Sequence, residues 1–131
     1  MVIIVVSTKE TMTTVSFQEY AASAEARKKI EEDVAKYSQM LCEALMDDFK
    51  RESTLDYKFY LSTGRKYFKV IMECNDGARS VHAFINRKTG EVYKAASWRG
   101  PAEHVRYDLR LIKDREYLFE NADWAGGYLY M

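Results

Sequence analysis

A stretch of 35 residues, 17–51, contains neither proline nor glycine and constrains the fold more than any other part of the chain. It is rich in alanine, glutamate, lysine, methionine and leucine, which are strong helix formers. Its apolar residues recur at steps of three or four, at Ile30, Val34, Tyr37, Leu41, Leu45 and Phe49. This spacing predicts a helix with one apolar stripe that lies on a sheet, or that forms a helix–helix dimer seam.

The start of this helix is less regular than its end. Ser16 and Glu19 have the spacing of a capping box, so we expect the helical region to span 16–52. An earlier apolar stripe that includes Tyr20 loses phase near residues 27–29. The region is therefore either one long helix with a bend or a short helix followed by a longer one.

Residues 1–15 are expected to form an N-terminal strand or an appendage. Their short apolar run, at 2–6, lacks the flanks of a signal peptide and is too short to span a bilayer. Met12 is an alternative start, in which case residues 2–6 would be an appendage. No membrane association is predicted.

After the helical region the apolar period changes from about 3.6 to two, which indicates strands. The alternation predicts four strands, near residues 55–62, 66–74, 79–86 and 91–96. The turn 75–77 has the sequence Asn-Asp-Gly, a strong signal for a hairpin. Tight turns between consecutive strands favour an antiparallel meander. We place Lys58, Tyr60, Lys69 and Glu73 on its outward face.

The remaining residues, 97–131, are predicted to form a loop, a short helix and an aromatic tail. Residues 105–112 are either a fifth strand or a turn of helix, and Asp114 is expected to cap a short helix that ends near Glu120. The tail 121–131 carries Trp, Tyr and Leu residues, so we expect it to pack on its own sheet or on a neighbouring subunit. The predicted fold is a single α+β domain, with a long N-terminal helix on a four- to five-stranded antiparallel meander.

Charge is divided unevenly along a chain of 131 residues whose net charge is zero. Residues 57–110 hold 11 Lys and Arg against five Asp and Glu, whereas residues 1–56 are acidic. The zero net charge argues against a protein that coats nucleic acid through bulk charge alone. The uneven distribution either lets the two halves complement each other or marks a basic binding surface.

The loop after the fourth strand holds the most informative residue, Trp98. It either folds back to cover the core or forms a platform with the basic residues near it. The sequence gives a binding role to three groups of residues. They are the loop residues Trp98, Arg99, His104 and Arg106, the strand residues Arg79, Tyr93 and Lys94, and the turn residues Arg87 and Lys88.

Motifs for catalysis, metals and cofactors are absent from the sequence. There is no GxGxxG, no Walker-type loop and no GxSxG. Cys42 and Cys74 have no metal-ligand spacing and read as reduced thiols. His82 is interpreted as structural and His104 as exposed, with no nucleophile placed beside either. We therefore expect no catalytic residues, no metal and no cofactor.

Two blocks, RSVHAFINRKTGEVYKAASWRGPAEHVRYDL and DWAGGYLYM, resemble a family of small, functionally uncharacterised proteins of tailed bacteriophages. The similarity covers about the C-terminal two-thirds of the chain. It implies a protein made in the cytoplasm of an infected bacterial host. It does not point to a particular activity, and it assigns no catalytic residues.

The preferred hypothesis is a phage accessory protein that binds a bacterial host or phage protein through the sheet and the Trp98 loop. It predicts a homodimer or higher oligomer built by the helix or the tail. The alternative is a protein that binds nucleic acid or a nucleotide through the basic residues of 57–110. A structural component of the virion is a further alternative.

Overall fold

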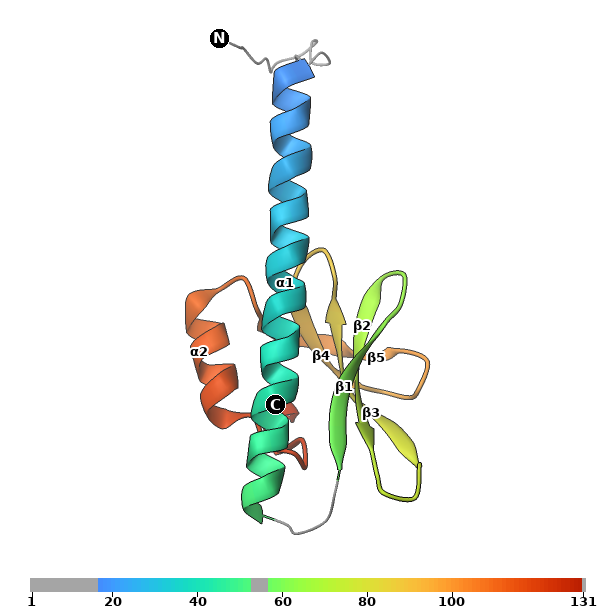
Figure 1. Cartoon of the computed structure of the whole chain (residues 1–131). Helices are drawn as coiled ribbons and strands as arrows, with labels where there is room; N and C mark the ends of the chain where they lie inside the picture. The colour runs from blue at the N-terminus through green and yellow to red at the C-terminus, as the bar shows by residue number, and fades with distance from the viewer. Residues whose placement is uncertain (1–16, 53–56, 131) are drawn as a thin grey trace.

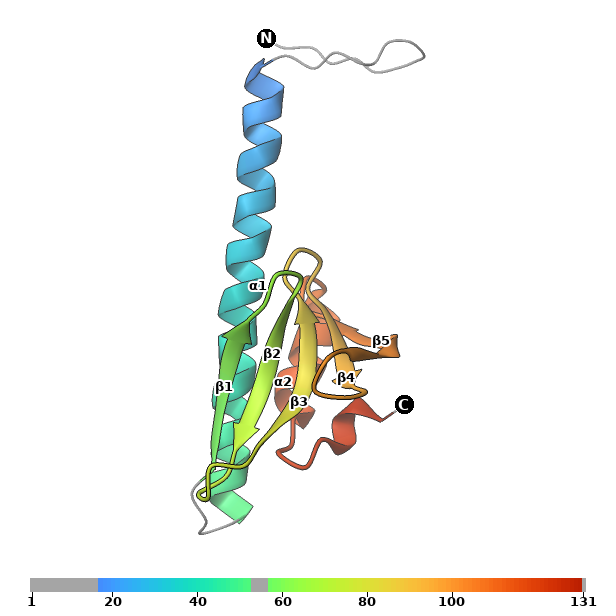
Figure 2. The same cartoon turned by 90° about the vertical axis from the view of Figure 1, so that its right-hand side faces the viewer.

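The computed structural model describes residues 17–52 and 57–130, and it shows the predicted α+β fold. The first element is a single helix, α1 (Phe17–Glu52), so the loss of phase near residues 27–29 does not break it. A helix of 36 residues is about 54 Å long, roughly twice the length of an eight-residue strand. Its first half therefore extends beyond the rest of the molecule (Figures 1 and 2).

Five antiparallel strands follow in chain order and form one meander. They are β1 (Lys58–Thr63), β2 (Tyr67–Glu73), β3 (Arg79–Asn86), β4 (Glu91–Ala95) and β5 (Pro101–Asp108). The strand order in the sheet is the same as the order in the chain. The β1–β2 and β3–β4 turns consequently lie at one end of the sheet, and the β2–β3 turn lies at the other (Figure 1).

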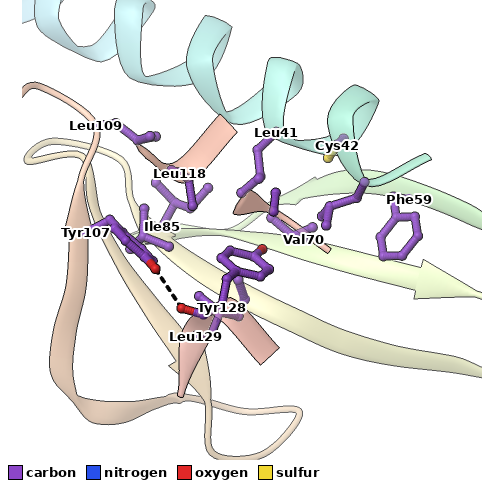
Figure 3. Packing of buried hydrophobic residues seen from close by; sticks show 14 of the residues in the cluster. Leu41, Cys42, Phe59, Val70, Ile85, Tyr107, Leu109, Leu118, Tyr128 and Leu129 are labelled. Carbon is purple, nitrogen blue, oxygen red and sulfur yellow. Dashed lines mark hydrogen bonds between the residues drawn. The ribbon is translucent and has the colours of Figure 1, made fainter. Parts of the chain in front are cut away.

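The helices cover one face of this sheet, which we call the inner face. The second half of α1 lies along β1 and β2, and α2 (Ile112–Asn121) lies beside α1 (Figure 1). The apolar stripe of α1 meets the apolar sides of the strands, as its spacing predicted. The core contains Leu41, Leu45, Phe59, Val70, Ile85, Val92 and Leu118, all of which are buried (Figure 3).

The C-terminal segment packs on the chain's own inner face. It includes the 3₁₀ helix η1 (Gly127–Leu129), whose Tyr128 and Leu129 are buried in the core. Tyr107 donates a hydrogen bond from its hydroxyl to the backbone oxygen of Tyr128 over 2.6 Å (Figure 3). Gly126 has a φ of +86°, a value that glycine adopts without strain, and this lets the chain turn back into η1.

Three sequence expectations are corrected by the structure. The alternation expected through β3 is interrupted by a β-bulge, because Val70 pairs with Ala83 but Ile71 pairs with Val81. The fifth strand starts at Pro101 rather than near 105, since proline is tolerated as the first residue of an edge strand. Asp114 lies inside α2 and does not cap it, because its carboxylate accepts a hydrogen bond from the Asp108 amide over 2.9 Å.

Some expectations fall outside the described residues. The strand or appendage proposed for residues 1–15 is among them, and so is Ser16, the first residue of the expected capping box. The four-strand prediction is otherwise confirmed, with boundaries within one or two residues wherever the chain is described.

Candidate functional site

The face of the sheet that points away from α1, which we call the outer face, carries the most distinctive surface. Phe68 and Val70 belong to the core, so their neighbour Lys69 points to the outer face. The strand register places the other outer-face residues beside it. They are Lys58, Tyr60, Tyr67, Ile71, Glu73, Arg79, Phe84 and Tyr93. The outward positions predicted for Lys58, Tyr60, Lys69 and Glu73 are confirmed.

Trp98 lies over this face. The β4–β5 loop that carries it arches over the side of the sheet opposite α1 (Figures 1 and 2). Lys69 Nζ is 4.7 Å from the centroid of the Trp98 ring, and Arg79 Cζ is 5.9 Å from it. Both distances fall within the range of a cation–π contact. Trp98 is 45% exposed, so it is an accessible aromatic ring held by two cations.

A second aromatic group lies next to Trp98 on the outer face. Phe84 is buried, and the ring of Tyr67 meets it edge-on with 5.7 Å between centroids. Tyr67 also meets Tyr93 edge-on, at 6.1 Å. Lys69 connects the two groups, because its Nζ lies 5.9 Å from the Phe84 centroid as well as over Trp98. The aromatic side chains thus pack against one another and form an ordered, partly apolar surface on the outer face.

Carboxylates and tyrosine hydroxyls complete the outer face. Tyr60 donates to Glu73 Oε1 over 3.1 Å, and Tyr93 donates to Glu91 Oε1 over 3.0 Å. Burial, followed by the hydrogen bond to Glu91, raises the pKa of Tyr93 to about 12. The Tyr60 hydroxyl beside Arg79 raises the pKa of that guanidinium, which is charged at any physiological pH. The outer face therefore combines both signs of charge with aromatic rings.

Only some of the nine predicted binding residues share this face. Trp98, Arg79 and Tyr93 come together on it, and Arg99 is an exposed neighbour in the Trp98 loop. Two others support the C-terminal segment. Lys94 Nζ lies over the Tyr130 ring at 4.8 Å, and Arg106 Nε donates to the Leu129 carbonyl over 2.7 Å.

The last three predicted residues lie elsewhere. His104 is an exposed residue of β5, 3.9 Å from the carboxylate of Glu103. Arg87 and Lys88 belong to the β3–β4 turn at the end of the sheet. Tyr67 and Phe84 were not among the predicted residues, although the period of two that placed Lys69 outward places Tyr67 on the same side.

His82, on the inner face, is the other residue with an unusual environment. It is the extra residue of the β3 bulge, and its Nε2 is 2.7 Å from the Tyr128 hydroxyl. Burial lowers the pKa of His82 to about 4, so the ring is neutral at pH 7. Burial also raises the pKa of the Tyr128 phenol well above its usual value, and a neutral phenol in that state is a poor nucleophile. This pair reads as a structural hydrogen bond.

The described residues contain no group of three or more His, Cys, Asp or Glu that could hold a metal ion. Across 17–52 and 57–130, no helix combines the length and apolarity needed to cross a membrane.

Comparison with known proteins adds one match. Neither curated proteins nor solved structures give a match to this chain. A family model described as a family of unknown function, DUF7717, matches residues 17–131. Because that match covers most of the chain, the protein belongs to the DUF7717 family.

Proposed function

We propose that this protein acts by binding another protein through the outer face, with Trp98 as the anchor of the interface. The observation that carries the proposal is the half-exposed Trp98 ring. Lys69 and Arg79 hold it through cation–π contacts beside the packed aromatic rings of the outer face. Tryptophan, tyrosine and arginine are enriched among residues that dominate interface energies. A pre-ordered aromatic also loses little conformational entropy on binding.

The charge pattern of the outer face favours a protein partner over a nucleic acid there. Glu73 and Glu91 lie among the cations and hold the hydroxyls of Tyr60 and Tyr93. Carboxylates at these positions would repel a phosphate backbone, whereas a protein surface can match both signs of charge. Phe84 is buried, and Tyr67 and Tyr93 are half-buried against neighbouring rings, which leaves little aromatic surface there for bases to stack on.

The resemblance to small proteins of tailed bacteriophages supports a host or phage protein as the partner. In that setting the protein works in the cytoplasm of the infected bacterium, as an accessory protein without catalytic activity. Self-association through α1 is compatible with this role, because the side chains from Glu25 to Lys29 on its projecting half are exposed.

The test is affinity capture with the tagged protein from bacterial lysate, with and without nuclease treatment, followed by mass spectrometry. Three baits are compared: wild type, Trp98→Ala and Tyr117→Ala. Tyr117 is the control because it is an aromatic residue of α2 that is 55% exposed and lies away from the outer face. We expect one protein to be retained by wild type and by Tyr117→Ala, and to be lost with Trp98→Ala.

Two results would contradict the proposal. One is equal capture by Trp98→Ala and wild type, which would remove Trp98 from the interface. The other is loss of all captured material on nuclease treatment, which would favour nucleic acid as the ligand.

A further inference from the structure

The end of the sheet where the β1–β2 and β3–β4 turns meet holds a separate basic cleft. The cleft has a volume of about 370 Å³ and is lined by Arg65, Lys66, Asn86, Lys88 and Thr89. Figure 2 shows the two turns side by side at the upper end of the sheet. A hydrogen bond from the Arg87 amide to the Lys66 carbonyl, over 3.0 Å, joins them directly.

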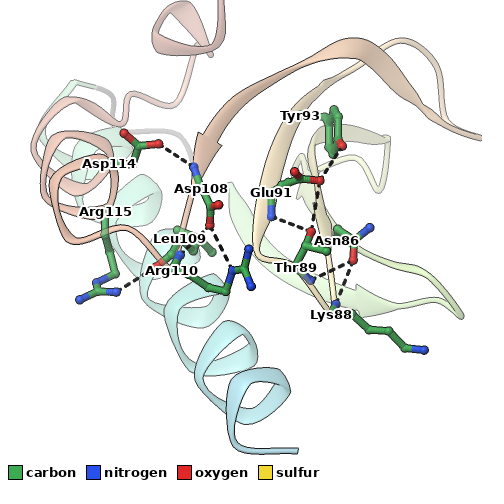
Figure 4. Close-up of polar contacts among 10 residues, drawn as sticks. All are labelled: Asn86, Lys88, Thr89, Glu91, Tyr93, Asp108, Leu109, Arg110, Asp114 and Arg115. Atoms are coloured by element: carbon green, nitrogen blue, oxygen red, sulfur yellow. Dashed lines mark hydrogen bonds and ion pairs between the residues drawn. The ribbon is translucent and has the colours of Figure 1, made fainter. Parts of the chain in front are cut away.

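The backbone around the cleft is held in place by its own residues. Arg87 Nη1 donates to the Gly64 carbonyl over 2.8 Å, which fastens the β3–β4 turn to the β1–β2 turn. Asn86 Oδ1 accepts hydrogen bonds from the amides of Lys88 and Thr89, at 2.9 and 3.1 Å (Figure 4). The positions from which the cationic side chains leave the backbone are therefore fixed.

Three cations of the cleft remain available. The side chains of Arg65, Lys66 and Lys88 are exposed and form no ion pair with any described residue. The Lys88 side chain makes no contact with the other residues drawn in Figure 4, and Lys66 Nζ rests 5.4 Å from the Tyr67 ring centroid. None of the described residues that line the cleft is a carboxylate. The nearby Glu91 is occupied, because it accepts hydrogen bonds from the hydroxyls of Thr89 and Tyr93.

We propose that this cleft between the two turns is a phosphate-binding site. Three free cations around one cavity without a carboxylate match the charge of a phosphate, and Arg87 adds a fourth positive charge beside it. The described lining residues include no aromatic ring, so binding depends on the phosphate and not on the base it carries. The site accounts for some of the positively charged residues of 57–110 that do not lie on the outer face. It does not depend on the proposed role of Trp98.

The probe is a fluorescently labelled 12-nucleotide oligothymidylate, with binding followed by anisotropy between 50 and 300 mM salt. Three variants are compared with wild type: Arg65→Ala/Lys66→Ala/Lys88→Ala, the charge-matched control Lys28→Ala/Lys36→Ala/Lys113→Ala, and Trp98→Ala. The control residues are exposed cations of α1 and α2 outside the cleft. We expect the cleft variant to bind at least tenfold more weakly at 50 mM salt, and the other two to bind within about twofold of wild type.

The salt dependence of oligonucleotide affinity provides a second measurement. Each phosphate contact to a single strand contributes roughly −0.7 to the slope of log affinity against log salt, so loss of three cations should flatten the slope by about two. Amide shifts in the NMR spectrum of the ¹⁵N-labelled wild type should be confined to the two turns, and this readout needs no variant. Thermal denaturation followed by circular dichroism verifies that the cleft variant is folded.

Inorganic tripolyphosphate distinguishes the source of the phosphate. If tripolyphosphate displaces the oligonucleotide when the two carry equal concentrations of phosphate groups, the natural ligand is a free nucleotide or phosphate. If the oligonucleotide binds more than tenfold more tightly than tripolyphosphate, the natural ligand is a nucleic acid backbone. The proposal is overturned if wild type binds neither probe at 50 mM salt, or if the cleft variant binds as well as the charge-matched control.

Discussion

The stability of this protein should depend on the protonation of one histidine. His82 has a pKa of about 4 in the folded protein, because burial beside Phe59 and Tyr128 disfavours its charged form. In the unfolded chain the same group has a pKa of about 6.5. Well above pH 6.5 the ring is neutral in both the folded and the unfolded state, so its titration does not change the free energy of unfolding. As the pH falls from 6.5 towards 4, the unfolded state takes up the proton first, so stability is lost.

The size of the loss follows from the two pKa values. At pH 5 nearly all unfolded chains carry the proton on His82, compared with about one-tenth of folded chains, and linkage gives a loss of about 2 kcal/mol between pH 7.5 and 5. Asp123, whose charge acts in the opposite direction on His82, keeps the loss from being larger. Histidine is the side chain whose ordinary charge change falls within this interval, and His104 is the only other histidine in the chain.

Urea denaturation at pH 7.5, 6.5, 5.5 and 5.0 measures this effect. His82→Gln should remove most of the pH dependence, whereas His104→Gln should leave it intact because the His104 side chain is 83% exposed. A free energy of unfolding that is constant over this range in wild type would refute the reasoning. So would a pH dependence that survives in His82→Gln.

Three further predictions concern the core. Tyr107→Phe removes the donor to the buried Tyr128 carbonyl and should lower the free energy of unfolding by about 1–2 kcal/mol in urea denaturation; an unchanged midpoint would show that the hydrogen bond contributes nothing. Ser38→Ala should leave stability unchanged or raise it by up to roughly 1 kcal/mol, because the buried Ser38 hydroxyl has no hydrogen-bond partner among the described residues; a clear loss would reveal one. Ellman's reagent at pH 8 should label the half-buried Cys74 first and Cys42 only after denaturation, since burial raises the pKa of Cys42 to about 12; equal rates would contradict the buried position of Cys42.

Most of the fold follows from local patterns in the sequence. The absence of proline and glycine over 17–51 and the stripe that includes Leu41 and Leu45 specify α1 and its buried side. The change to a period of two, with turns such as Asn75-Asp76-Gly77, specifies the order of the strands. These features could be predicted because each depends on residues that are close together in the chain.

The features that were mispredicted depend on contacts that the strand and helix patterns do not encode. The bulge at His82 places its ring against Phe59 and Tyr128, a residue 46 positions away. The carboxylate of Asp114 is used by the Asp108 amide, so the spacing that suggested a helix cap has another purpose. The first contact joins residues far apart in the chain, and the second depends on how the end of β5 lies against the start of α2.

The candidate site was predicted only in part for the same reason. Tyr93 and Lys94 are adjacent in a strand and therefore point to opposite faces, which the period of two already implies. The roles of Arg87 and Arg106 were not predictable, because each guanidinium binds a backbone carbonyl from a segment more than 20 residues away. The exposure of Trp98 likewise depends on how the β4–β5 loop lies over β2 and β3.

The central claim is that Trp98 anchors a protein interface and is not a core residue. Its most direct test compares Trp98→Ala with wild type in two measurements: free energy of unfolding, and affinity for the captured partner by calorimetry. Because Trp98 is 45% exposed, we expect a stability loss of at most about 2 kcal/mol, below the range of roughly 3–5 kcal/mol for a buried tryptophan. The affinity should fall by about 30-fold or more, as for an interface anchor. A variant that is unfolded, or one that binds the partner as tightly as wild type, would contradict the account.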